Sequence, residues 1–157
     1  MPPPIKASTA PTRTLRSNYP EPFATRMARR EKRPLGDRFG LRNFGVNLTR
    51  IAPGGESALF HRHSRQDEFV YVLEGEVVLV TNQGEQTLRA GDCAGYPAGK
   101  ADAHHFINRS NAPARYLEVG NRDPEDTAFY PDDDLAFDDD GRYVHKDGTP
   151  YRDEPHT

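Results

Sequence analysis

The sequence predicts an all-β domain in which antiparallel strands form a sandwich or a barrel. From Phe44 onward, short apolar runs are interrupted about every 8 to 12 residues by turn signals such as APGG, EG, TNQG and AGD. β-branched and aromatic residues fill these runs, and none of the runs keeps a helical period. With 157 residues, of which 34% are hydrophobic, the chain suffices for one such domain with one core and is short for two.

The two ends of the chain differ from this region and from each other. Residues 1–22 are rich in Pro, Ser and Thr, and we expect them to form a flexible, extended arm before a barrel of residues 23–120 that includes N-terminal strands. Residues 1–50 hold eleven Lys or Arg against three Asp or Glu, whereas residues 121–157 hold four against twelve. We therefore expect an acidic C-terminal tail that packs on the barrel and complements the basic segment of its own chain or of a partner subunit.

Composition also bears on the compartment and the partners. No apolar run reaches the roughly 18 residues of a membrane span, and the N-terminus lacks the apolar segment of a secretory signal. Cys93 has no second cysteine to pair with, and we expect it to be a small buried side chain rather than a nucleophile. The basic residues Arg29, Arg30, Lys32 and Arg33 could contact phosphate backbones, but complementing the acidic tail is the simpler interpretation. We expect a cytoplasmic protein with no membrane or nucleic-acid partner.

Two turns delimit the expected central strands. Gly75, between VYVL and EVVLV, is expected to take a positive φ in a tight hairpin, and Asn82 to Gly84 are expected to form a slightly longer one. Both turns predict that strands adjacent in the sequence pair with each other.

The run Phe69–Leu73 is apolar at every position, so we expect both of its faces to be covered. Val70 and Val72 are expected inside the barrel, and the residues of opposite parity are expected to face outward. These outward residues are Phe69, Tyr71 and Leu73. Either the segment near residues 39–44 or a second subunit would cover them, and we favour a two-fold homodimer.

Candidate metal ligands surround this strand. Side chains alternate along a strand, so His61 and His63 point to the same side, and a turn after them lets Glu68 face the same space. A further interior strand begins with His104 and His105, and parity favours His104 because it shares its side with Phe106 and Asn108. The predicted site is one divalent metal ion held by imidazole and carboxylate groups. Its predicted ligands are His61, His63, Glu68 and His104.

These residues also resemble the two motifs of the cupin superfamily. The first motif is matched by Gly55, His61, His63, Glu68 and Gly75, and the second by Gly91, Pro97, Gly99, His104 and Asn108. One departure is that four residues, rather than the usual two, separate Gly99 from His104. The resemblance covers about residues 44–120 and implies a small jelly-roll β-barrel. The whole chain is also similar to small bacterial single-domain cupins, some of which are labelled sugar-phosphate isomerases by analogy.

The cupin fold does not determine which reaction a member catalyses, because cupins include isomerases, dioxygenases, decarboxylases, storage proteins and sensor domains. Zinc, iron, manganese or nickel would suit these ligands. We expect a metal-dependent enzyme acting on a small polar metabolite such as a sugar phosphate, with isomerisation ahead of oxygenation. The general base is left open among Tyr96, Tyr116 and Glu118.

The alternative is a non-catalytic cupin that binds a metal or small molecule in sensing or regulation. A regulatory cupin would normally carry a helix-turn-helix module, but residues 1–43 are too short and too broken by proline for one.

Overall fold

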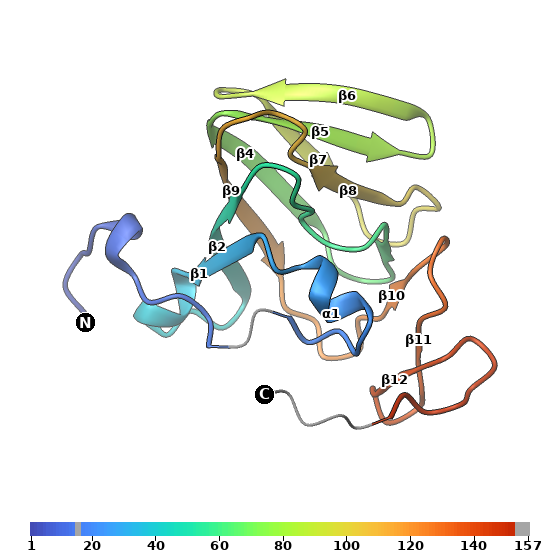
Figure 1. The fold of residues 1–157 in the computed structure, drawn as a ribbon. Helices are drawn as coiled ribbons and strands as arrows, with labels where there is room; N and C mark the ends of the chain where they lie inside the picture. The colour runs from blue at the N-terminus through green and yellow to red at the C-terminus, as the bar shows by residue number, and fades with distance from the viewer. Residues whose placement is uncertain (15–16, 153–157) are drawn as a thin grey trace.

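Two antiparallel sheets form the body of the molecule (Figure 1). The computed structural model describes residues 1–14 and 17–152. The larger sheet has the order β1-β2-β9-β4-β7, and its strands are Arg30–Pro34, Phe44–Ile51, Ala114–Asn121, Glu68–Glu74 and Cys93–Tyr96. The smaller sheet has the order β6-β5-β8, and its strands are Gly84–Arg89, Glu76–Thr81 and His104–Ile107.

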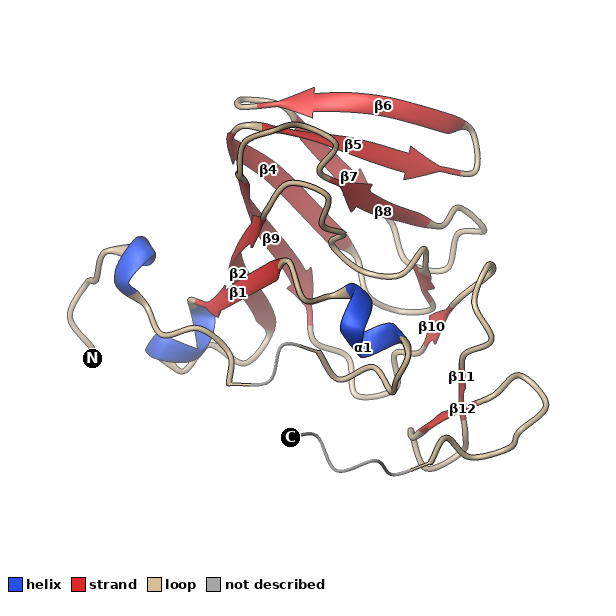
Figure 2. Cartoon of the chain, viewed as in Figure 1, coloured by secondary structure: helices blue, strands red, loops and turns tan. Residues whose placement is uncertain are grey.

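Shorter elements lie around these sheets (Figure 2). Two pairs of two-residue strands join the C-terminal segment to the rest and to itself: β3 (Arg62–His63) pairs with β10 (Ala128–Phe129), and β11 (Ala136–Phe137) pairs with β12 (Tyr143–Val144). The helical elements in the described residues are the short α1 (Phe23–Arg26) and the 3-10 turns η1 (Ala7–Thr9) and η2 (Gly36–Phe39). The predicted all-β class is confirmed.

The main core lies between the two sheets, because both contribute to one buried cluster. Val70 and Val72 on β4 and Tyr116 on β9 come from the larger sheet, and Val77 and Phe106 come from the smaller one. Large apolar side chains of this kind stabilise a fold by about 1.5–3 kcal/mol each when fully buried. The core therefore determines which side of each sheet faces inward. Polar side chains on those sides also point into the space between the sheets.

The positive φ predicted for Gly75 is confirmed, but the hairpin predicted there is wrong. Gly75 has a φ of 73°, as expected, and a Cβ there would lie 2.6 Å from the carbonyl oxygen of Pro113. However, β4 bonds to β7 and β9, whereas β5 bonds to β6 and β8. The chain therefore passes from one sheet to the other at Gly75 instead of forming a hairpin. The hairpin predicted at Asn82 to Gly84 is confirmed, but it is tight rather than longer, since Thr81 pairs with Gly84 and only Asn82 and Gln83 form the loop.

The outer side of β4 is exposed. Val70 and Val72 are buried, as predicted, while Phe69, Tyr71 and Leu73 are 44%, 42% and 45% exposed. Phe39 and Phe44, from the segment considered as a cover, are exposed themselves. The expectation that both faces of β4 are covered is therefore not met within one chain.

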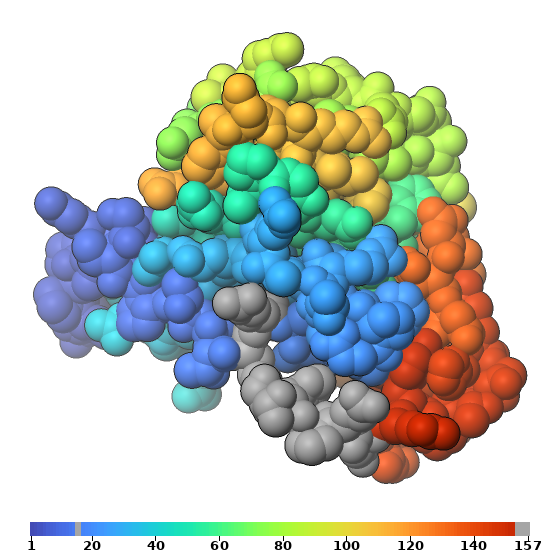
Figure 3. Space-filling view, in the orientation of Figure 1, coloured from blue at the N-terminus to red at the C-terminus, as the bar shows by residue number. Residues whose placement is uncertain are grey.

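The N-terminal and C-terminal segments lie against each other (Figure 3) and share a second core with Leu59. Its buried members are Tyr19, Phe23, Met27, Leu59, Tyr130 and Leu135. Arg26 forms ion pairs with both Glu56 and Asp133 at 2.9 Å, so basic and acidic segments meet within one chain. Ala10, in the segment expected to be an arm, is also buried.

Two further expectations concern single features. Cys93 is exposed at the start of edge strand β7, so the expectation of a buried cysteine is wrong. Asn108 is fully buried, and its side-chain amide donates to the carbonyl oxygens of Ile51 and Ala112.

Among residues 1–14 and 17–152, no helix has the length and apolarity to cross a bilayer.

Candidate metal centre

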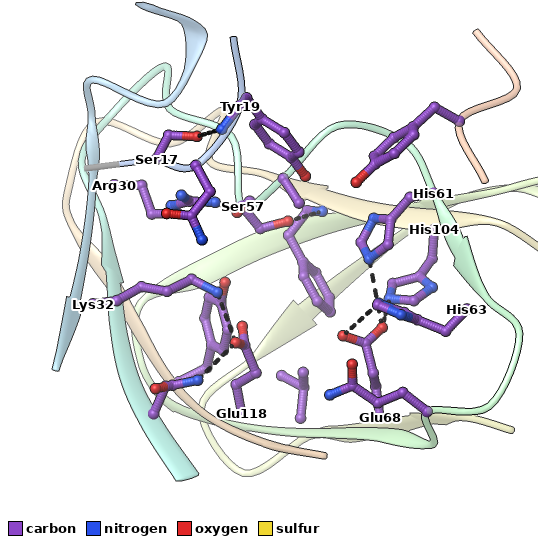
Figure 4. Close-up of a pocket in the computed structure, with 18 of the residues that line it drawn as sticks. Ser17, Tyr19, Arg30, Lys32, Ser57, His61, His63, Glu68, His104 and Glu118 are labelled. Atoms are coloured by element: carbon purple, nitrogen blue, oxygen red, sulfur yellow. Dashed lines mark hydrogen bonds and ion pairs between the residues drawn. The ribbon is translucent and has the colours of Figure 1, made fainter. Parts of the chain in front are cut away.

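Three of the four predicted ligands, His61, Glu68 and His104, bring their ligand atoms together, and His63 lies beside Glu68 without joining that group. His61 and His63 lie on either side of the first residue of β3, Glu68 begins β4, and His104 begins β8. The Nε2 atom of His104 lies 2.9 Å from Glu68 Oε2, that of His61 lies 3.6 Å from the same oxygen, and that of His63 lies 3.5 Å from Glu68 Oε1. Figure 4 shows the three rings turned toward the carboxylate.

Backbone pairing explains this convergence. His61 and His104 form an antiparallel bridge, with N···O distances of 3.2 and 2.8 Å, which holds the HxH segment against β8. Residues directly opposite in such a bridge project their side chains to the same side. His105 points the other way: its Nδ1 lies 3.0 Å from the carbonyl oxygen of Ala58, and its ring packs against Phe60. The structure thus places His104, and not His105, beside Glu68.

Two of the imidazoles are held in the tautomer that a metal ion requires. His61 Nδ1 lies 2.7 Å from the carbonyl oxygen of Leu59, and His63 Nδ1 lies 2.6 Å from Asp126 Oδ2. Since neither oxygen can donate, each Nδ1 carries the proton and each Nε2 presents its lone pair to the centre. Asp126 is itself anchored by the backbone N–H of Arg65, at 2.8 Å.

The third imidazole is held by packing. The ring of His104 is stacked on Tyr96 with a centroid distance of 3.5 Å and an interplanar angle of 4°. Burial lowers the pKa of His104 and so favours the neutral form.

The position of the Glu68 carboxylate suits a divalent cation. Among the described residues, the buried Glu68 Oε2 makes no hydrogen bond of acceptable geometry, although an imidazole nitrogen lies 2.9 Å away. A buried carboxylate oxygen without a hydrogen bond is costly unless a charge compensates it. His61, Glu68 and His104 each offer a ligand atom, and these atoms lie within 4.8 Å of one another. The donor set, imidazoles with one carboxylate, fits a first-row divalent ion.

The candidate centre opens into a cavity of about 360 Å³. The opposite wall carries Lys32 on β1 and Glu118 on β9, whose Nζ and Oε1 atoms lie 2.7 Å apart (Figure 4). Asn47 also donates to Glu118 Oε1, at 3.2 Å. Burial lowers the pKa of Lys32. Burial would raise the pKa of Glu118, but Lys32 and Asn47 outweigh it and the pKa is lowered, so the carboxylate is ionised.

Three tyrosines from the terminal segments line the cavity as well. Tyr19 precedes α1, and Tyr130 and Tyr143 belong to the C-terminal segment. The hydroxyl oxygens of Tyr130 and Tyr143 lie 3.4 Å apart, and the rings of Tyr19 and Tyr130 make an edge contact at 5.8 Å. Burial raises the pKa of Tyr19 to about 12 and raises that of Tyr130 further. These phenols are therefore neutral and can both donate and accept hydrogen bonds.

The residues left open as general bases are now placed. Glu118 and Tyr116 line the cavity, and Tyr96 lies behind His104. The sequence analysis missed the cations of the pocket and the orienting carboxylate Asp126. For Arg30 and Lys32 a signal existed, because residues two apart on a strand share a face, but the strands expected in the N-terminal part of the barrel were not assigned to particular residues. For Asp126 and the tyrosines no local pattern points to the site.

Comparisons with known proteins agree with this fold and these motifs. A family model described as the cupin domain matches residues 47–120. A solved structure named a sugar phosphate isomerase from a cupin superfamily, from Silicibacter pomeroyi, is 44% identical to this chain, with a TM-score of 0.86 over 96% of this chain and 98% of that one. A second structure whose name refers to a sugar phosphate isomerase, from Acidithiobacillus ferrooxidans, is 31% identical, with a TM-score of 0.69 over 80% of this chain and 81% of that one.

Curated plant proteins match over a shorter stretch. Germin-like protein 1-1 of Oryza sativa subsp. japonica is 35% identical over 89 residues, which are 52% of this chain and 40% of the relative. The chain thus spans less than half the length of this relative. The domain match, the superposition over nearly the whole chain and the two motifs around the candidate centre show that this chain belongs to the cupin superfamily.

Proposed function

We propose that the protein is a metal-dependent isomerase of a small phosphorylated sugar. The observation that carries the proposal is that one cavity is lined both by the three imidazoles and carboxylate of the candidate centre and by a second, ionised carboxylate, Glu118. The names of the two solved relatives support the same reaction class.

The spacing of the two carboxylates leaves room for a substrate. On the sheet, Glu68 pairs with Gly120 and Val70 pairs with Glu118, so Glu68 and Glu118 are diagonal neighbours on the inner face. Such positions lie about 7–8 Å apart. A hydroxy-carbonyl group fits between a metal ion held at Glu68 and the Glu118 carboxylate.

Isomerisation of a hydroxy-carbonyl compound moves one proton between adjacent carbons and one between their oxygens, with no oxidant or reductant. Glu118 would accept the carbon-bound proton and return it to the neighbouring carbon, while Lys32, at 2.7 Å, keeps the carboxylate ionised and oriented. The neutral hydroxyls of Tyr19, Tyr130 and Tyr143 would hold the remaining substrate hydroxyls. A bound divalent ion would act as a Lewis acid toward the two reacting oxygens.

The test is proton exchange with solvent. The purified protein is incubated with aldose and ketose phosphates in D₂O, and NMR follows deuterium at the carbons beside the carbonyl. We expect incorporation with the wild type and a loss of about 10²-fold or more with Glu118→Gln. Glu85→Gln, on exposed strand β6 outside the pocket, is the matched control and should retain the rate. If the phosphates tried show no exchange while metal and ligands still bind, the protein is a binding cupin and not an isomerase.

A further inference from the structure

Two glycines lie beside Glu68 on the inner face of the larger sheet. Gly45 on β2 pairs in register with Gly120 on β9, and Gly120 pairs with Glu68 on β4. Gly120 is also two residues from Glu118, so both residues face the same side of β9. The sheet therefore has no side chain at the position that adjoins both carboxylates of the cavity.

The side chain of Gln66 occupies the space above Gly120. A Cβ on Gly120 would clash with Nε2 of Gln66, and it would lie 3.0 Å from the carbonyl oxygen of Asp67. A Cβ on Gly45 would meet only ordinary contacts, the nearest at 3.6 Å from Arg122 Nε. Of the two paired glycines, Gly120 is thus the one whose lack of a side chain admits the carboxamide.

The backbone of Gln66 is anchored by the carboxylate that orients His63. Its N–H donates to Asp126 Oδ1 at 3.0 Å, while Asp126 Oδ2 lies 2.6 Å from His63 Nδ1. The side chain is half-buried and lines the cavity of the candidate centre. Within the described part of the chain its carboxamide makes no hydrogen bond, so its two donors and its acceptor remain for a ligand.

We propose that the Gln66 carboxamide binds the reacting oxygens of the substrate, and that position 120 must be glycine for the carboxamide to reach them. This rests on the proposed function, which places a hydroxy-carbonyl group between Glu68 and Glu118. Nε2 donates to the oxygen that gains negative charge as Glu118 removes the carbon-bound proton, and Oε1 accepts from the neighbouring hydroxyl. The carboxamide itself transfers no proton.

The test is binding of glycerate, whose adjacent hydroxyl and carboxylate oxygens stand in for the reacting group, to the full-length protein as purified. Ligand-observed NMR gives the dissociation constant, and elemental analysis gives the metal content of each variant. We expect Gln66→Met, which keeps the length of the side chain but not its hydrogen bonds, to weaken glycerate binding about tenfold or more. Gly120→Ala should weaken it similarly by displacing the carboxamide. The double variant should match the single ones, because both substitutions remove the same contact.

The matched control is Gly45→Ala, at the register partner of Gly120. Neither glycine has a positive φ, so alanine suits both backbones. Because a Cβ on Gly45 meets only ordinary contacts, Gly45→Ala should change glycerate binding by less than about twofold.

Several results would overturn this role of Gln66. Unchanged glycerate binding in Gln66→Met, or no binding to the wild type, would show that the carboxamide does not hold the ligand. Equal weakening in Gly45→Ala would show a general disturbance of the sheet, and additive losses in the double variant would show that Gly120 acts elsewhere. Loss of metal in Gln66→Met would show that the side chain supports the metal ligands instead. If Gly120→Ala does not fold, as judged by circular dichroism, Gln66→Met decides alone.

This role and the isomerase proposal can fail separately. Glycerate binding that depends on Gln66, without any exchange of substrate protons in D₂O, would retain the role and reject the reaction. Proton exchange with an unchanged kcat/KM in Gln66→Met would retain the reaction and reject the role.

Discussion

Lys32 and Glu118 are joined by an ion pair across strand β2, with 2.7 Å between Nζ and Oε1 and side chains only 14% and 20% exposed. The pair links the edge strand β1 to the middle of the larger sheet. Because both groups have lost most of their water, the energy of each depends on the other.

Removing one partner of this pair should destabilise the protein more than removing both. We expect Lys32→Met to lower the free energy of unfolding by about 2–3 kcal/mol, since it leaves a carboxylate largely buried without its cation. The double variant Lys32→Met/Glu118→Gln should recover most of that loss. Urea unfolding of the two variants and the wild type measures the difference, and equal losses would show that the pair is not coupled.

Stoichiometric metal should depend on the HxH pair. We expect His61→Ala/His63→Ala to abolish it, because two of the four candidate ligands are removed. His104→Ala should weaken binding much more than His105→Ala, whose ring faces Phe60. Elemental analysis of protein purified without added metal measures both effects, and full occupancy in the double variant would place the metal elsewhere.

Asp126 should act through His63. Asp126→Asn keeps the shape of the side chain but weakens the acceptor for His63 Nδ1–H, so we expect metal affinity to fall about 10- to 100-fold. The neighbouring Glu125→Gln is the control, since Glu125 is exposed and paired with Arg65. Competition with a chelator of known affinity gives the ratio, and an equal effect of the two substitutions would refute the role of Asp126.

The exposed stripe on β4 should be an interface between two copies of the chain. Three large apolar side chains, Phe69, Tyr71 and Leu73, each expose more than two fifths of their surface on one side of the strand. Patches of this kind mark association surfaces. We expect light scattering at micromolar concentration and moderate salt to give the mass of a dimer, and Tyr71→Glu to give that of a monomer. A monomeric wild type would remove the dimer.

The alternation of side chains along a strand explains which features could be predicted from the sequence. The alternation of His61 and His63 and the shared face of Glu68, Val70 and Val72 depend only on local strand geometry, so the common side of the candidate ligands and the outward direction of Phe69, Tyr71 and Leu73 could be predicted, whereas the exposure of that outward side could not. The crossing at Gly75 could not, because a glycine at positive φ serves equally in a hairpin and in a passage between sheets.

Other features depend on tertiary packing. Asp126 reaches His63 from a sequence separation of 63 residues, and Arg13 lies at the pocket in a segment whose backbone N–H donates to the carbonyl oxygen of Lys32. No periodicity links either residue to the barrel. The cavity therefore contains groups, Tyr130 and Tyr143 among them, whose place could be learned only from the folded chain.

The contact between Tyr19 and Tyr130 has a consequence for how such proteins diversify. One ring comes from before the barrel and the other from after it, and together they close a wall of the cavity. A change in either terminal segment can alter which molecule fits, while the strands that bear His61, Glu68 and His104 stay as they are. In the proposed enzyme, the side chains that select the substrate and those that hold the metal therefore lie in separate stretches of the chain, which can change one at a time.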